Sequence, residues 1–450
     1  MDKHKKHIVI LGAGESGAGA ALLAQQQEYD VFVSDGGPIA AAFVRELEEN
    51  NIRYEQGGHT EALVLKADEV VKSPGIPEKA SIMKKIREAG IPVISEIELA
   101  YRFAKGKKII AITGSNGKTT TTALTYDIFK KAGLNAACVG NIGNSFARQV
   151  ALAPADYYIV EISSFQLDDI QQFRPEVAVL LNITPDHLDR YDHKMEQYAA
   201  AKLRIVENQG PEDYFIYCLD DPGINQYLKN LPVQSKILPF TTMEPLKEGG
   251  FIANKELNLR VGEEEDLVVS IYDLALQGRH NLYNSMAAGI AARTMDIRNE
   301  HIRASLTSFR SLEHRLEYVA SVRGIDFIND SKATNINSVW FALESMHQPV
   351  VLIMGGIDKG NDYSIIAGLV KEKVKAIVCL GKDNHLIHDA LAQHVPVIVN
   401  TESMHDAVHA SFFLSQKGDV VLLSPACSSF DLFKNYEDRG RQFKQEVHAL

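Results

Sequence analysis

Short runs of β-branched and other apolar residues recur along the chain, and segments with a helical spacing of apolar residues separate them. This alternation is typical of parallel strands joined by crossover helices. In the first hundred residues it predicts a small doubly wound α/β unit. The predicted strands are 7–11, 31–34, 69–72 and 92–94, and the predicted helices lie near 17–28, 38–50 and 79–89.

The alternation continues in two further units. In the second, strands are predicted at 136–140, 157–162 and 177–181, antiparallel edge hairpins in the Gly- and Glu-rich stretch 233–275, and a helix at 281–294. In the third, the predicted strands are 326–328, 350–354, 376–380, 397–399 and 420–423. A chain of 450 residues exceeds what one hydrophobic core usually supports.

We therefore predict three α/β domains, each built on a mostly parallel doubly wound sheet. Their expected bounds are 1–100, 101–311 and 312–450. The first and third are expected to be Rossmann-like, and the central one is expected to be a P-loop domain.

The composition narrows the class of partner. A formal net charge of −11, with 23% charged residues, argues against a broad nucleic-acid or acidic-membrane surface. No apolar run approaches the ~20 residues that span a bilayer, and the first residues lead into a strand rather than a signal sequence. The four cysteines lack Cys-x-x-Cys spacing and are expected to be reduced thiols. These features predict a cytoplasmic protein without membrane insertion.

A phosphate-binding loop is the most informative motif. Ile112-Thr-Gly-Ser-Asn-Gly-Lys-Thr-Thr120 follows a β-branched strand and precedes a predicted helix. Its glycines let backbone N–H groups converge on phosphate oxygens at a helix N-terminus. Lys118 would reach the terminal phosphates, and Thr119 would offer a hydroxyl to Mg²⁺. Ile112 stands where the common pattern has a glycine, and the alternative is a chance Gly-Lys-Thr in a surface turn.

A second glycine motif follows the first predicted strand. Gly12-Ala-Gly-Glu-Ser-Gly17 has the spacing of a dinucleotide-binding turn, and Asp35 at the end of the second strand suits a ribose hydroxyl. A nicotinamide-dependent oxidoreductase is therefore an alternative function, although the triphosphate loop argues against it. The same geometry would hold the diphosphate of a UDP-sugar, or would only pack a helix on a strand.

Three ionisable residues of the second unit are candidates for the site. Glu161 lies in an otherwise apolar strand, where a carboxylate is costly unless it is paired or binds a metal such as the Mg²⁺ near Thr119. The alternative is an edge strand with Glu161 solvated. His187, after the next strand, is a candidate ligand or hydrogen-bond donor. Lys202, on a predicted helix, would ordinarily be a solvated surface residue.

Three loops follow strands of the third unit. They are Asp330-Ser-Lys-Ala-Thr-Asn335, Gly355-Gly-Ile-Asp-Lys359 and Ser424-Pro-Ala-Cys-Ser-Ser-Phe430. Because parallel strands end at one edge of a sheet, these loops predict a common binding face for an anionic group. The alternative is that they are helix N-caps and turns.

Together these motifs resemble one family, the Mur ligases of peptidoglycan synthesis. The resemblance rests on the phosphate loop, Glu161-Ile-Ser-Ser, Asn182-Ile-Thr-Pro-Asp-His187, His280-Asn, His314-Arg315 and the Asp330 loop, and it covers nearly the whole chain. The start and the Ser424 loop are most similar to the member that adds D-glutamate to UDP-N-acetylmuramoyl-L-alanine. The resemblance implies an ADP-forming ligase whose three domains bind the UDP-sugar, ATP and the amino acid, and a monomer is expected. Another Mur ligase, a folate polyglutamate ligase and a non-catalytic nucleotide sensor are the alternatives, besides the oxidoreductase.

The resemblance also implies site residues. For ATP these are Gly114, Ser115, Asn116, Gly117, Lys118, Thr119, Thr120, Asn281, Asn284, Arg315 and Asp330. For the UDP-sugar they are Ser16, Asp35, Ser73, Gly75, Asn141 and His187, and for D-glutamate they are Lys332, Thr334, Lys359, Ser429 and Tyr436. Two Mg²⁺ ions would be held by Thr119, Glu161, His187 and a carbamylated Lys202, and the catalytic residues would be Lys118, His187 and Lys202. Lysine must be modified for this role because an ammonium has no lone pair, whereas a carbamate presents oxygen ligands.

Overall fold

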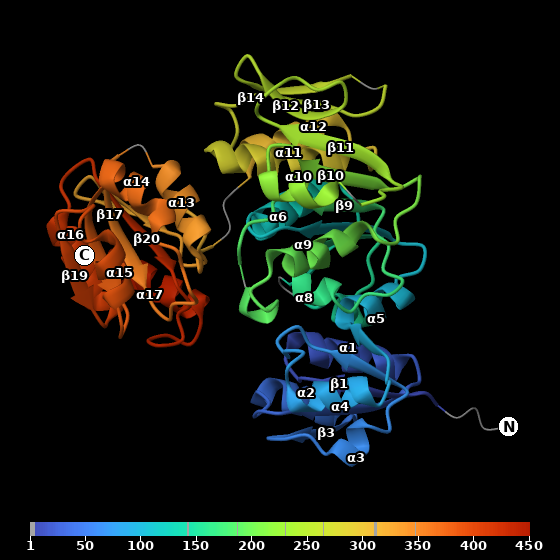
Figure 1. Cartoon of the computed structure of the whole chain (residues 1–450). Helices are drawn as coiled ribbons and strands as arrows, with labels where there is room; N and C mark the ends of the chain where they lie inside the picture. The colour runs from blue at the N-terminus through green and yellow to red at the C-terminus, as the bar shows by residue number, and fades with distance from the viewer. Residues whose placement is uncertain are drawn as a thin grey trace. The chain divides into compact units, whose positions relative to one another are not determined.

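The computed structural model describes residues 5–141, 144–186, 188–229, 231–263, 265–309, 313–346 and 348–450. Within these ranges the chain forms three α/β sheets, which belong to two compact units (Figure 1). The first unit comprises Met1–Leu274 and Leu282–Ser308 and contains two of the sheets. The second comprises Ala275–Asn281 and Phe309–Leu450. The predicted fold class is confirmed, whereas the three domain bounds stay a prediction.

The N-terminal sheet of the first unit has the strand order β3-β2-β1-β4-β5 and is parallel. Its elements are β1 (His7–Leu11), α1 (Glu15–Gln26), β2 (Asp30–Asp35), α2 (Ala41–Glu49), β3 (Arg53–Gln56), α3 (Glu61–Val64), β4 (Glu69–Lys72), α4 (Ser81–Glu88), β5 (Val93–Ser95) and α5 (Glu96–Phe103). Alternate apolar residues such as Val9 and Val70 pack against Ile82 and Ile86 of α4. The strand β3 was not predicted because its sequence, Arg-Tyr-Glu-Gln, is polar and lies at the sheet edge.

The second sheet contains the phosphate loop and has the order β14-β13-β12-β11-β10-β9-β6-β8-β7. Its strands are β6 (Lys108–Thr113), β7 (Ala136–Gly140), β8 (Tyr157–Glu161), β9 (Val177–Leu180), β10 (Tyr214–Cys218), β11 (Lys236–Thr241), β12 (Gly249–Ala253), β13 (Glu256–Arg260) and β14 (Leu267–Ser270). Its α-helices are α6 (Lys118–Lys131), α7 (Phe146–Leu152), α8 (Ser164–Leu167), α9 (Met195–Leu203), α10 (Pro222–Leu228), α11 (Arg279–Arg293) and α12 (Asn299–Ser308), with 3₁₀ segments η1 (Leu188–Arg190) and η2 (Arg204–Val206).

The stretch 233–275 corrects one prediction. Only β12, β13 and β14 pair antiparallel, whereas β11 pairs parallel with both β10 and β12. The helix α10 lies between β10 and β11 in the chain and provides the crossover connection that a parallel pair needs. The parallel part of the sheet therefore extends further into this stretch than its polar composition suggests.

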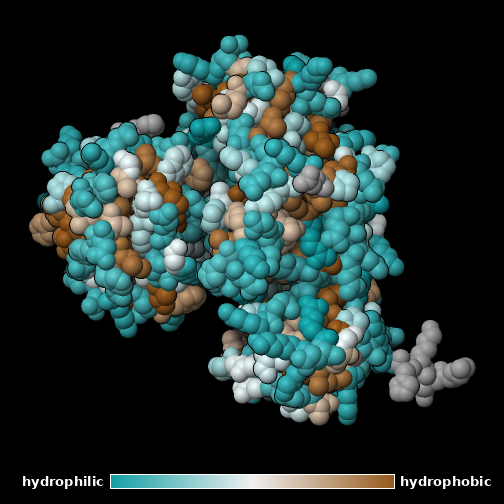
Figure 2. Space-filling view, in the orientation of Figure 1, coloured by the Kyte–Doolittle hydropathy of each residue, from teal (hydrophilic) through white to brown (hydrophobic). Residues whose placement is uncertain are grey.

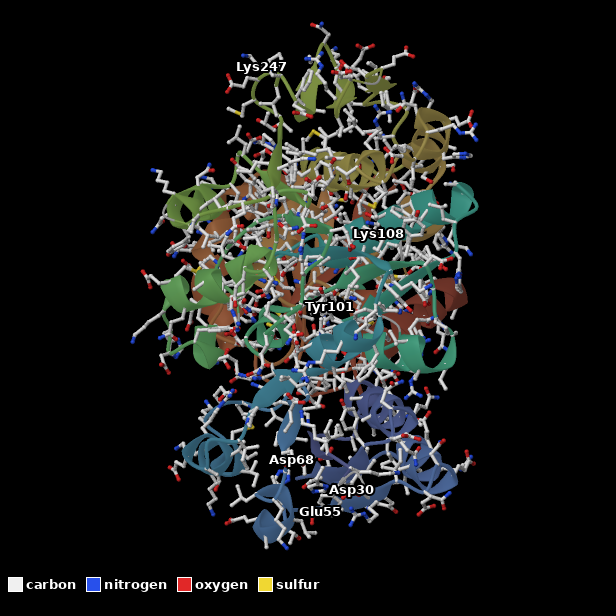
Figure 3. All side chains as sticks on the ribbon, turned by 90° about the vertical axis from the view of Figure 1, so that its right-hand side faces the viewer. Asp30, Glu55, Asp68, Tyr101, Lys108 and Lys247 are labelled. Atoms are coloured by element: carbon white, nitrogen blue, oxygen red, sulfur yellow. The ribbon has the colours of Figure 1, made fainter. Side chains whose placement is uncertain are left out.

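Close helix packing joins the two sheets of the first unit. A β-carbon on Gly19 of α1 would lie 2.0 Å from the Ser145 hydroxyl at the N-terminus of α7, so the two helices approach closely only with glycine there. The Arg148 guanidinium in α7 pairs with Glu15 of α1 at 2.7 Å and with Glu46 of α2. Figure 3 labels Tyr101 in α5 and Lys108 at the start of β6, which mark the chain connection between the sheets.

The sheet of the second unit has the order β15-β16-β20-β17-β18-β19, and β15 is its antiparallel edge. The elements are β15 (Glu317–Val322), β16 (Ile325–Asn329), α13 (Ile336–Glu344), β17 (Val350–Gly355), α14 (Ser364–Lys373), β18 (Val374–Leu380), α15 (His385–Leu391), β19 (Ile398–Thr401), α16 (Met404–Leu414), β20 (Val420–Ala426) and α17 (Tyr436–Ala449). One apolar core lies under α13, α14 and α15, and a second lies under α16 and α17. The sheet is therefore doubly wound.

Most of the visible face of the molecule is hydrophilic, with apolar residues scattered over it (Figure 2). The four cysteines are free thiols, as predicted. Within the described ranges, no helix combines the length and the apolar character needed to cross a membrane.

Candidate active site

The phosphate loop joins β6 to α6 in the interior of the second sheet, where β6 pairs with β8 and β9. Gly117 caps α6 with φ of +83°, a left-handed conformation that favours glycine. Asn182, just after β9, fixes the loop from the next strand. Its Oδ1 accepts from the Asn116 N–H at 2.8 Å, and its Nδ2 donates to the Asn116 carbonyl at 3.1 Å. The loop is therefore held in shape by the protein itself.

Two lysines approach the same carbonyl of this loop. The Nζ of Lys118 donates to the Gly114 oxygen at 2.8 Å and to the Ser115 oxygen at 2.9 Å, and the Nζ of Lys202 donates to the Gly114 oxygen at 2.8 Å. Lys202 is only 2% exposed, so the solvated-surface alternative is wrong. Burial and then the nearby charge of Lys118 lower the pKa of Lys202 well below its ordinary value, which favours its neutral amine.

Glu161 is buried at the end of β8, which pairs with β6 on one side and β7 on the other. The alternative of a solvated edge residue is therefore wrong, since Glu161 is 1% exposed. Its Oε1 accepts from Asn141 Nδ2 at 2.9 Å, whereas its Oε2 is buried and has no hydrogen-bond partner among the described residues. A buried carboxylate oxygen of this kind is costly unless a cation binds it. Thr119, at the start of α6, is buried as well, and His187 lies outside the described residues.

A cavity of about 270 Å³ brings several of the predicted residues together. Its lining includes Lys118 and Lys202 from the phosphate site, and Gly75 and Asn141 from the residues assigned to the sugar. The other lining residues were not predicted as site residues from the sequence. These are Pro74, Ser163, Ser164, Phe165, Asp186, Arg190 and Tyr198.

Arg190 links this cavity to the N-terminal sheet. Its guanidinium lies 4.3 Å from the centroid of the Phe165 ring and donates to the carbonyl oxygens of Pro74 and Ile76, each at 3.2 Å. Those carbonyls flank Gly75. No local pattern distinguishes Arg190 from a surface arginine, because its partners lie more than a hundred residues away.

The N-terminal glycine loop has a packing explanation of its own. A β-carbon on Gly17 would lie 1.8 Å from the Gly12 oxygen, and Ser73 Oγ donates to the same oxygen at 3.3 Å. The Asp35 carboxylate accepts from the backbone N–H of Ala13 at 2.7 Å and of Gly37 at 2.8 Å. Ser16 lies in the first turn of α1 beside this loop. The glycine pattern alone therefore does not establish dinucleotide binding.

In the second unit, buried charged groups brace the loops after β16 and β20. Asp330 Oδ2 accepts from Ser424 Oγ at 2.9 Å, and burial raises the pKa of Asp330 to about 7, opposed by this bond and by Arg315. Arg439 of α17 was not identified from the sequence. Its guanidinium donates to Ser331 Oγ at 3.0 Å and to the Cys427 oxygen at 3.2 Å.

The residues assigned to D-glutamate surround the strand ends of this sheet. Lys332 Nζ lies 5.1 Å from the centroid of the Tyr436 ring, and Ser429 is buried after β20. Thr334 is half-buried after β16, and Lys359 is exposed after β17. Because β16, β20 and β17 are parallel neighbours, the three predicted loops lie together at the carboxyl ends of these strands, as expected.

The remaining residues assigned to ATP divide between the units. Asn284 is buried in the first unit and its Oδ1 accepts from Thr121 Oγ1 of α6 at 3.1 Å. Asn281, Arg315 and Asp330 belong to the second unit. Thr120 is half-buried in the first turn of α6.

Family models match most of the chain. The Mur ligase middle domain matches residues 112–292, the Mur ligase, glutamate ligase domain matches 314–427, and the MurD N-terminal domain matches 7–82. The chain is 52% identical to a UDP-N-acetylmuramoylalanine--D-glutamate ligase of Porphyromonas gingivalis, and the alignment covers 100% of both chains. It is 54% identical to the ligase of the same name from Bacteroides thetaiotaomicron, over 99% of this chain and 100% of the relative.

Solved structures share the fold at lower identity. A pseudomurein peptide ligase type C from Methanothermus fervidus has a TM-score of 0.62 and 19% identity. UDP-N-acetylmuramate-alanine ligase from Thermotoga maritima has a TM-score of 0.63 and 17% identity. Each comparison covers 99% of this chain and 100% of the other. These two likenesses concern the fold alone.

Proposed function

Because the chain belongs to the Mur ligase family, we propose that it joins D-glutamate to UDP-N-acetylmuramoyl-L-alanine and converts ATP to ADP and phosphate. Relatives that carry the name of this ligase match essentially the full length at more than 50% identity. The structural observation that carries the proposal is the shared cavity, in which Lys118 of the phosphate loop lines the same space as Gly75 and Asn141. A folate ligase would give the matched N-terminal domain no role.

The first step activates a carboxylate, which is a poor electrophile. The carboxylate oxygen of the L-alanyl group attacks the γ-phosphorus of ATP, and the bond to the β–γ bridging oxygen breaks to release ADP. The product is an acyl phosphate. In this step Lys118 offsets the repulsion between the carboxylate and the phosphates and stabilises the charge of the transferring group. Its anchoring on the loop carbonyls fixes its ammonium beside the phosphate site.

The buried carboxylate of Glu161 supports a Mg²⁺ site. Its Oε2 has no partner among the described residues, and the Thr119 hydroxyl is the second candidate oxygen ligand. When bound, the ion would neutralise phosphate charge during transfer. We also propose that a second Mg²⁺ ion binds at Lys202 and His187.

In the second step, the amine of D-glutamate attacks the acyl carbon. The tetrahedral intermediate expels phosphate, and the amine loses its proton as the amide forms. D-Glutamate carries two carboxylates, so cations are needed to hold it. We assign Lys332 and Lys359 to this role, with Thr334, Ser429 and Tyr436 as hydrogen-bonding groups on the same sheet edge.

We further propose that Lys202 reacts with CO₂ to form a carbamate. Its neutral amine attacks the carbon of CO₂ and loses one proton, which gives an anionic carbamate with two oxygen atoms that can bind a metal. The burial that lowers the pKa of Lys202 favours this reaction because only the neutral amine is nucleophilic. Its position beside the phosphate loop then suits an ion near the γ-phosphate.

The carbamate is tested by replacing Lys202. Lys202→Ala should lose nearly all activity, and short-chain carboxylic acids should restore part of it by supplying oxygen ligands. Lys194→Ala, at an exposed position just before the same helix, is the matched control and should remain active. Full activity of Lys202→Ala, or an unmodified ammonium in an active crystal with two Mg²⁺ ions bound, would contradict the carbamate.

The proposed reaction is tested by ADP release in a coupled assay. Release should require UDP-N-acetylmuramoyl-L-alanine and D-glutamate together, and L-glutamate should not replace the D-isomer. ADP release that needs no UDP-sugar, or that follows a folate substrate instead, would contradict the proposal.

A further inference from the structure

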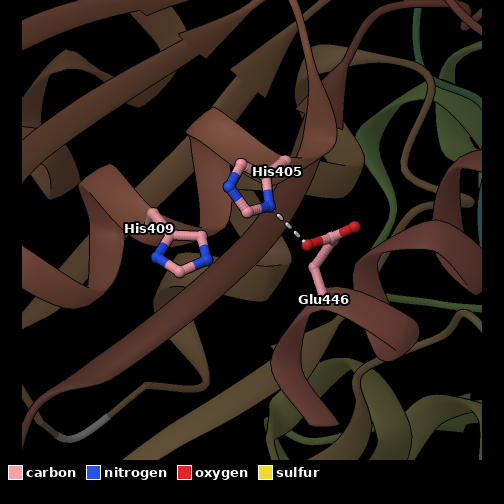
Figure 4. Close-up of side chains that lie close together, drawn as sticks. All are labelled: His405, His409 and Glu446. Carbon is pink, nitrogen blue, oxygen red and sulfur yellow. Dashed lines mark hydrogen bonds and ion pairs between the residues drawn. The ribbon is translucent and has the colours of Figure 1, made fainter. Parts of the chain in front are cut away.

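Two histidines and a glutamate converge on the surface of the second unit, and none of the three is assigned to the proposed reaction (Figure 4). His405 and His409 lie one turn apart on α16, and Glu446 lies on α17. His405 Nδ1 is 2.8 Å from Glu446 Oε2, and the two imidazole centroids are 4.2 Å apart. One potential ligand atom from each residue lies within 4.8 Å of the other two.

The backbone behind this cluster is well fixed. Ala407 and Val408 of α16 and Phe443 and Val447 of α17 are buried in one apolar core against the sheet. The i, i+4 spacing places both imidazoles on the same side of α16, facing the neighbouring helix. The side chain of His405 is 63% exposed and that of Glu446 is 30% exposed, so an ion from solvent has access.

The donor set selects a class of ion. Two imidazole nitrogens and one carboxylate oxygen suit borderline divalent metals such as Zn²⁺, whereas Mg²⁺ prefers oxygen ligands. Ligands about 2.0–2.1 Å from a tetrahedral Zn²⁺ stand about 3.4 Å apart, so modest side-chain rotations would close the observed spacing. Three protein ligands leave the fourth position to water. A simple His–Glu ion pair would explain His405 and Glu446, but it leaves the adjacent imidazole of His409 without a reason.

We propose that His405, His409 and Glu446 form a binding site for one Zn²⁺ ion that bridges α16 and α17. The bridge would add a cross-link to the second unit and stabilise the folded chain by an amount that grows with the logarithm of the metal concentration above the Kd. Because α17 begins at Tyr436, which is assigned to D-glutamate, a bound ion would also tie the helix that carries this residue to α16. The inference itself does not depend on the proposed ligase reaction.

The test measures Zn²⁺ binding to the full, tag-free chain by competition with a chromophoric chelator, in the presence of excess Mg²⁺. The wild-type chain should bind one Zn²⁺ tightly enough to compete, and His409→Ala and Glu446→Gln should each weaken binding by at least tenfold. Zn²⁺ should also raise the melting temperature of the wild-type chain. His448→Ala, an exposed histidine on α17 outside the cluster, is the matched control and should bind as the wild type does.

Two further measurements separate the possible results of this test. Circular dichroism before metal addition establishes that each variant is folded. Anomalous scattering at the zinc edge should place the ion between the two helices. Failure of the wild-type chain to bind Zn²⁺ would overturn the proposal. Binding by His409→Ala and Glu446→Gln as tight as that of the wild type would also overturn it, because the ion would then be held elsewhere.

Discussion

The phosphate loop of the first unit and the strand-end loops of the second unit use buried ionisable groups in opposite ways. In the first unit, Lys202 and Glu161 are buried near the cavity. The Oε2 atom of Glu161 has no hydrogen-bond partner among the described residues. In the second unit, Arg439 is equally buried, but its guanidinium donates to Ser331 and Cys427 and holds two loops together. There the cation assigned to substrate, Lys359, is exposed.

The difference indicates which charges act on ligands and which support the fold. A buried charge whose bonding groups are satisfied by the protein stabilises a loop, and its removal costs stability. A buried charge with an unsatisfied atom, or a lysine beside a phosphate loop, is available to a ligand. Burial alone therefore does not identify a catalytic residue.

The largest expected effect is at Lys118. Lys118→Ala removes a charge that acts on the transferring phosphoryl group, so kcat should fall by about 10³-fold with the fold intact. Lys130→Ala, an exposed lysine near the end of α6, is the control and should be close to wild type. Steady-state ADP release measures both. Activity of Lys118→Ala within a few-fold of wild type would place phosphate binding elsewhere.

A smaller and more selective effect is expected at Lys359. Loss of one charge-assisted hydrogen bond to a carboxylate should raise the KM for D-glutamate about 10–100-fold and leave the KM values for ATP and the UDP-sugar nearly unchanged. Lys371→Ala, at an exposed position of α14 in the same unit, is the control. An equal rise of all three KM values would instead assign Lys359 to the structure of the unit.

The smallest of the expected effects is at Asp330, where the prediction concerns how the free energy of unfolding depends on pH. Because burial raises its pKa to about 7, the folded chain binds this proton more tightly than the unfolded chain. Its contribution is therefore lost as pH rises from about 4 toward 7, by about 4 kcal/mol at most, since one pKa unit corresponds to about 1.4 kcal/mol. Asp330→Asn should remove this slope, so its melting temperature relative to wild type should rise across that range. Asp326→Asn on the same strand is the control, and parallel curves for Asp330→Asn and wild type would contradict the assignment.

The sequence predicted the parts of the site that are contiguous in the chain. The phosphate loop, the strand that contains Glu161 and the three strand-end loops all have local patterns, because apolar periodicity and glycine spacing mark them directly. Arg190 and Arg439 were missed because each donates to a backbone carbonyl more than a hundred residues away in the sequence. The burial of Lys202 was missed for the same reason, since its helix has a polar, alanine-rich sequence and its hydrogen-bond partner, the Gly114 oxygen, lies 88 residues away.

We propose that Lys118 of the first unit acts in the activation of the carboxylate, whereas Lys359 of the second unit serves only D-glutamate. Positional isotope exchange tests it with ATP labelled by ¹⁸O at the β–γ bridge, in the presence of UDP-N-acetylmuramoyl-L-alanine and without D-glutamate. Reversible phosphoryl transfer moves the label to a non-bridging β-oxygen. The account predicts exchange in the wild type and in Lys359→Ala at similar rates, and none in Lys118→Ala. Exchange that disappears in Lys359→Ala, or persists in Lys118→Ala, would contradict it.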